Sequence, residues 1–147
     1  MKIFPRALLL LAILSSQAFA GPFTDEMSKC LVRETSDSDK TLFIQWLYAA
    51  MSSHPDVKNL ANISPAQASQ MNEDAAGLVM DLLADRCKDE TAQAIKYEGK
   101  NAFETSFAVL GQVAMQGLMA NQDVQGYLSG LEKHFDGERL ASALAVE

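Results

Sequence analysis

Residues 39–53, DKTLFIQWLYAAMSS, form the stretch around which the fold is predicted to organise. Nine of the ten residues from Leu42 to Met51 are apolar or aromatic, and they include Trp46, the only tryptophan of the chain. A helix that is apolar on all sides is normally surrounded by other helices. The stretch therefore predicts the central helix of a small bundle.

Apolar residues recur at helical spacing on both sides of this stretch, and no segment shows the sustained alternation typical of a strand. Helices are predicted near residues 23–31, 65–86, 89–98, 103–118 and 124–131, with two more turns near 138–147. Gly111 and Gly117 interrupt the 103–118 helix and predict that another backbone approaches it closely. The sequence thus predicts an all-α domain, a single compact bundle of five to seven helices.

Capping signals mark two helix starts. Ser36 and Asp39 resemble a capping box at the start of the Trp46 helix, and Ser64 with Gln67 forms the same pattern before the 65–86 helix. Pro55 should follow the end of the Trp46 helix, because the residue before a proline avoids helical geometry.

The N-terminal segment has the features of a secretory signal. Lys2 and Arg6 precede an apolar run over residues 7–14, and Ala18-Phe19-Ala20 offers small residues at a cleavage site. The run is too short to span a bilayer, and Gly21 follows the cut where a lipoprotein would have cysteine. We expect residues 1–20 to be removed and residues 21–147 to form one domain in the periplasm or outside the cell.

Charge restricts the partners. A chain beginning at Gly21 has ten basic residues against 19 acidic ones, a net charge of −9. An acidic surface repels nucleic acid phosphates and anionic lipid heads. We expect a cationic protein partner, with no nucleic acid and no membrane; the oligomeric state is not predicted.

Cys30 and Cys87 are the two cysteines, and both lie in the exported part. In an oxidising compartment such a pair predicts one structural disulfide. A reactive or metal-binding pair is the alternative, but CxxC spacing and histidine-rich surroundings are missing. The bond would join the first helix to the end of the third, with the Trp46 helix between them.

Catalytic signatures are missing. The two histidines, His54 and His134, are far apart in sequence, and HExxH, GxSxG and phosphate-binding glycine loops do not occur. Asp81, Asp85 and Asp89 lie at helical spacing, which indicates a solvated face more than a cation site. We expect no enzyme activity and no cofactor.

Residues 121–132 resemble an EF-hand loop in part. Oxygen-bearing side chains stand at loop positions one, three and five, glycine at six and glutamate at twelve, and a bound calcium ion would depend on Asp123 and Glu132. The alternative is a helix break in which Asp123 caps the next helix and Gly126 serves packing.

The order of these features resembles one family. Small periplasmic immunity proteins that neutralise type VI secreted cell-wall amidases also have a signal peptide, an all-α fold, paired cysteines and a tryptophan-bearing helix after the first cysteine, as Trp46 follows Cys30 here. A helix ending in cysteine comes later in both. The resemblance covers residues 27–96 and implies a homodimer that blocks an amidase with a loop, for which the exposed candidate here is 52–64.

Two functions are weighed. The first is an exported, non-catalytic binding protein, an inhibitor or immunity protein acting on a secreted enzyme. The alternative is a carrier whose methionines enclose a small apolar ligand. Its candidate ligand contacts are Met51, Met71, Met80, Met115 and Met119.

Overall fold

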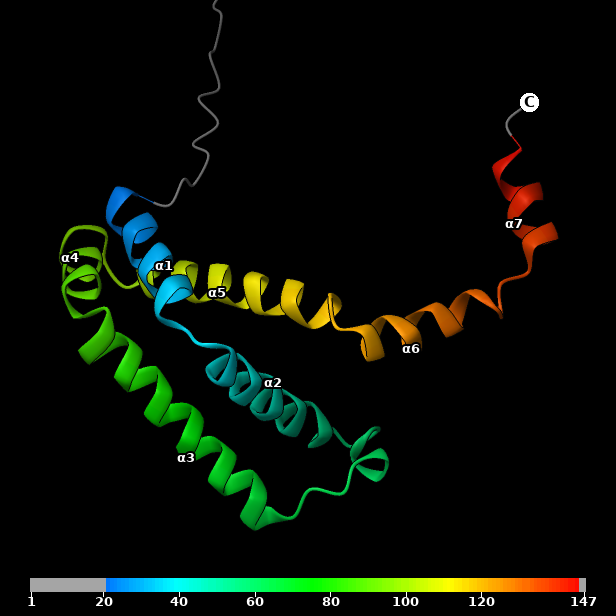
Figure 1. The fold of residues 1–147 in the computed structure, drawn as a ribbon, viewed down its shortest axis with the longest axis horizontal. Helices are drawn as coiled ribbons and strands as arrows, with labels where there is room; N and C mark the ends of the chain where they lie inside the picture. Colours follow the sequence, from blue (N-terminus) through cyan, green and yellow to red (C-terminus); the bar gives the residue numbers. More distant parts are fainter. Residues whose placement is uncertain (1–20, 146–147) are drawn as a thin grey trace, which may run out of the picture.

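The computed structural model describes residues 21–145, and this part of the chain is all-α. The predicted helical bundle tied by one disulfide is confirmed. The predicted signal segment, residues 1–20, lies outside the described residues. The elements shown in Figure 1 are α1 (Pro22–Glu34), α2 (Asp37–Ser52), the 3-10 turn η1 (Lys58–Leu60), α3 (Pro65–Asp81), the π-helical turn η2 (Leu82–Arg86), α4 (Lys88–Glu98), α5 (Asn101–Met119), α6 (Gln122–Glu132) and α7 (Gly137–Leu144).

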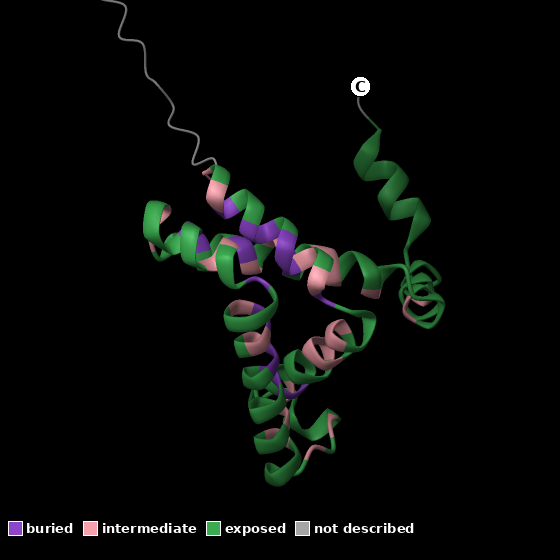
Figure 2. Cartoon of the chain, turned by 60° about the vertical axis from the view of Figure 1, so that its left-hand side comes forward, coloured by how far each residue is buried: buried purple, intermediate pink, exposed green. Residues whose placement is uncertain are grey.

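The core forms around α1, which packs against α4, η2 and the first half of α5. Met27, Leu31 and Leu82 are completely buried there, together with Ala94 and Ala102. Figure 2 shows the buried positions concentrated on α1 and on the elements that cover it. Each large side chain buried in this way contributes about 1.5–3 kcal/mol to folding, so α1 is the centre of the bundle.

The Cys30–Cys87 disulfide forms within this core, as the sequence predicts. Cys30 lies on the buried side of α1, and Cys87 follows η2, with a Cα–Cα distance of 5.9 Å. The bond therefore fastens the central helix to the end of the α3–η2 segment.

The predicted central position of the Trp46 helix is wrong. This helix, α2, packs against α3 on one side, and Ala49 is the one buried residue of α2. Trp46 is 37% exposed and Met51 is 61% exposed. The disulfide consequently does not enclose α2. The apolar composition of α2 predicts that several of its sides are in contact with other helices. It does not indicate which helices make these contacts.

The helix boundaries follow the predicted capping chemistry. Ser36 with Asp39, and Ser64 with Gln67, both form complete capping boxes. Helix α2 ends at Ser52, before Pro55, and α4 ends at Gly99, whose φ of 78° suits glycine.

Arg86 fixes the position where α2 leaves the core. Its guanidinium donates to the carbonyl oxygen of Glu34 at 2.7 Å, to Asp39 Oδ2 at 2.8 Å and to Asp81. These acceptors belong to the ends of α1, α2 and α3. One side chain thus connects three helix termini beside the disulfide.

Candidate protein-binding surface

Helix α5 has buried residues in its first half only. Its buried residues are Ala102, Ser106 and Leu110, and none of the residues from Gly111 to Met119 is buried. In Figure 1, α5 continues well beyond the end of α1, and α6 and α7 follow it. The 18 residues from Thr105 to Gln122 include no charged side chain. The outer half of α5 therefore exposes an electrically neutral surface.

Helices α6 and α7 extend this surface. Neither contains a buried residue, and both are almost entirely green in Figure 2. Leu128, Leu131 and Phe135 recur at helical spacing along one side of α6 and the turn after it, and all three are exposed. Leu140 and Leu144 likewise lie one turn apart on α7, and both are exposed. We call residues 111–144 the apolar arm.

A second exposed apolar surface lies on α2. Trp46 Nε1 donates to Asn72 Oδ1 of α3 at 2.9 Å, which places the Trp46 side of α2 toward α3. With 3.6 residues per turn, residues 44, 48 and 51 lie on the opposite side, and residue 47 lies beside them at about 100° from Trp46. Leu47, Tyr48 and Met51 are between about half and two thirds exposed there. We call these four positions the α2 stripe.

The predicted close approach to Gly111 and Gly117 is wrong for contacts within the described chain. Apart from the backbone of α5 itself and the adjacent residues, no heavy atom of the described chain lies within 4 Å of the position that a Cβ would occupy at either glycine. Both residues belong to the exposed half of α5. They lower helix propensity without serving any packing contact between the described helices.

The EF-hand-like segment is a helix and not a loop. Asn121 caps α6, because its side-chain oxygen accepts hydrogen bonds from the backbone N–H groups of Asp123 and Val124. The capping role predicted for Asp123 thus belongs to Asn121. Asp123 and Glu132 stand at opposite ends of α6, about 13 Å apart along its axis, too far for both carboxylates to bind one calcium ion.

The other candidate metal ligands also lie apart. His54 is exposed in the loop after α2, His134 is exposed after α6, and Asp81 pairs with Arg86. Among residues 21–145, no three histidine, cysteine or acidic side chains gather around a point that suits a metal ion.

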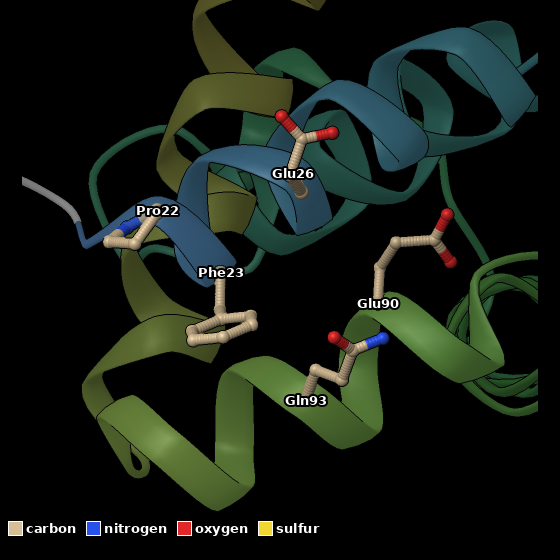
Figure 3. Close-up of a pocket in the computed structure, with 5 residues that line it drawn as sticks. All are labelled: Pro22, Phe23, Glu26, Glu90 and Gln93. Carbon is tan, nitrogen blue, oxygen red and sulfur yellow. The ribbon is translucent and has the colours of Figure 1, made fainter.

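The five methionines proposed as carrier ligands belong to three helices, α2, α3 and α5. Met71 of α3 is partly buried, and the other four are each about half exposed or more. Two open hollows occur elsewhere, along α4. Figure 3 shows one of about 300 Å³, where Phe23 of α1 points toward α4. Its lining residues are Pro22, Phe23, Glu26, Glu90 and Gln93.

The sequence did not predict the apolar arm, because the helices near residues 103–118 and 124–131 were expected to belong to a single compact bundle. The signal that could have identified the arm is the run of 18 uncharged residues around Gly111 and Gly117. The segment 52–64, expected to be exposed, is largely exposed, with Leu60 at 83%.

No protein-family model, no curated protein and no solved structure matches this chain. Among the helices of residues 21–145, none combines the length and hydropathy required to cross a bilayer. The resemblance to amidase immunity proteins thus stays a prediction.

Proposed function

We propose that this protein is an exported, non-catalytic binding protein whose apolar arm docks onto a protein partner. The observation that carries the proposal is the exposure of apolar helix surface along the outer half of α5, which is uncharged, and along α6. Exposed apolar patches larger than a few hundred Å² mark interaction sites in soluble proteins. A secreted enzyme that the protein inhibits is the kind of partner we expect.

The charges around the arm define the chemistry of that partner. Asp123, Glu132, Asp136 and Glu138 border the apolar residues of α6 and α7, against only Lys133 and Arg139. Apolar contacts contribute most of the binding energy at such an interface, and rim charges steer the encounter. The partner should therefore present an apolar surface bordered by lysine and arginine.

The carrier function is less well supported. Small-molecule pockets occupy about 300–1,000 Å³ and bury most of the ligand. The hollow in Figure 3 is at the lower end of this range, is open, and is lined in part by Glu26 and Glu90. None of the five candidate methionines contributes to it.

A matched pair of charge variants tests the proposal. Leu128→Glu places one charge on the arm, where Leu128 is 41% exposed, and Ile95→Glu places one charge on α4, where Ile95 is 40% exposed. Each protein is immobilised in its oxidised form and used for quantitative capture from periplasmic extract of its own source. The captured protein is then purified, and its Kd is measured at several salt concentrations. We expect the arm variant to weaken binding at least about 100-fold and the α4 variant to leave it unchanged.

Alanine at Gly117 gives a second, independent test. The site of its Cβ is open, so Gly117→Ala should stabilise α5 by about 1 kcal/mol. The same substitution adds a methyl group to the arm and should weaken a closely packed partner. Equal binding by all variants, or a partner bound through α4, would refute the arm as the site. Sedimentation of the purified protein tests whether the arm binds a second copy of the chain. A dimer that the Leu128→Glu substitution abolishes would refute a different protein as the partner of the arm.

A further inference from the structure

The N-terminus of α1 is capped by a side chain that is distant in sequence, because it belongs to α4. Gly21 is the N-cap residue and has no side chain to offer. Glu98, in the last turn of α4, accepts hydrogen bonds from the backbone N–H groups of Phe23 at 2.9 Å and Thr24 at 2.8 Å. Its carboxylate also accepts from the Thr24 hydroxyl. Glu98 therefore does for α1 what a capping side chain at position 21 normally does.

The carboxylate of Glu98 occupies the space that a side chain at position 21 would need. A Cβ built on Gly21 would fall onto this carboxylate, with Oε2 only 2.6 Å away. Any other residue at position 21 would require the flexible Glu98 side chain to shift. The backbone nitrogen of Gly21 is about 2.5 Å from that Cβ position by covalent geometry, so it lies within about 5 Å of Oε2.

We propose that cleavage before Gly21 completes this cap, because the new α-ammonium group of Gly21 forms an ion pair with Glu98. In the uncut chain the same nitrogen is a neutral amide with one N–H. After cleavage it is a cation with three donors, within the distance at which opposite charges interact directly. The proposal rests on the cleavage predicted after Ala20 and is independent of the proposed function.

Pairing of this kind makes processing a stabilising event. The ion pair joins the first residue of the mature chain to α4, and the same carboxylate remains bonded to α1. Burial alone would raise the pKa of Glu98, but the hydrogen bonds from the Thr24 hydroxyl and from two backbone N–H groups together lower it, so the carboxylate is charged at neutral pH. An extra residue before Gly21 would move the ammonium group away by about 3.8 Å.

Four proteins test the proposal. A tobacco etch virus protease site placed before Gly21 yields a chain that begins at Gly21, and the same design with Ala20 retained yields a chain one residue longer. Both are made with Glu98 and with Glu98→Gln, which keeps an acceptor but removes the charge. We expect the Gly21 form to melt about 2–4 °C above the Ala20 form with Glu98 present, and this difference to disappear with Glu98→Gln.

The reactivity of the α-amine is a second measurement, and a change in stability alone would not affect it. At neutral pH, acylation of the Gly21 amine should be several-fold slower with Glu98 than with Glu98→Gln. An equal melting difference in both backgrounds, or equal acylation rates, would overturn the proposal. So would a mass spectrum of the exported protein in which the chain begins at a residue other than Gly21.

Discussion

Loss of the Cys30–Cys87 bond should destabilise the protein strongly, and the structure sets the magnitude. The two cysteines are 57 residues apart in sequence, and closing a loop of this length restricts the unfolded chain by about 4 kcal/mol. Both cysteines are almost fully buried, between α1 and the end of η2. For a domain of this size, that loss should lower the melting temperature by about 12 °C.

Thermal unfolding followed by circular dichroism, with and without a phosphine reductant, measures the effect. A thiol count on the unfolded protein establishes that the bond is reduced. The variant carrying Cys30→Ala and Cys87→Ala is the control, because the reductant should not change its melting temperature. Melting of the fully reduced protein within about 1 °C of the oxidised one would refute the argument, since the bond would then contribute nothing measurable.

Three further predictions concern the core, the Arg86 cluster and α2. Leu31→Ala should lower the free energy of unfolding by about 3 kcal/mol, because Leu31 is completely buried. Leu60→Ala, at an exposed site, should change it by less than about 0.5 kcal/mol. Urea unfolding measures both values, and equal losses would contradict the assigned core. Burial alone would raise the pKa of Asp39, but hydrogen bonds from Arg86 and the α2 cap residue lower it below its usual value. The stability that Asp39 contributes should therefore be present above about pH 4 and lost as the pH falls through its folded pKa. The melting temperature of Asp39→Asn should consequently fall less steeply with acidification than that of the unmodified protein. An equally steep fall would contradict this prediction. Trp46→Phe should lower the free energy of unfolding by no more than about 1 kcal/mol, because it removes one hydrogen bond at a partly exposed site. A loss above about 3 kcal/mol would instead indicate that Trp46 is buried and that α2 is the central helix.

The helix boundaries could be predicted because short-range chemistry determines them. The serine caps at positions 36 and 64 bond to groups only three residues away, and Gly99 ends α4 through its own backbone conformation. The disulfide could also be predicted, since two cysteines in an oxidising compartment allow one pairing within the chain.

Interactions between distant residues could not be predicted in this way. Glu98 caps α1 from more than 70 positions away, and nothing near Gly21 in the sequence indicates it. The π-helical turn η2 before Cys87 was also unexpected, because the apolar stripe continues through it. Periodicity identifies the side of a helix that needs cover, but the covering helix depends on the whole fold.

The error about α2 and the error about the glycines of α5 have the same form. An apolar helix predicts surrounding helices, and glycines within a helix predict a close backbone, but residues 21–145 supply neither the cover on the α2 stripe nor a neighbour at Gly111 and Gly117. Both rules describe what a surface contacts, and they do not require the contact to come from the same chain. A partner on the apolar arm would satisfy the rule for α5, while the α2 stripe would still need cover of its own. Charge variants on the two surfaces should therefore affect partner binding differently, with the arm variants dominant.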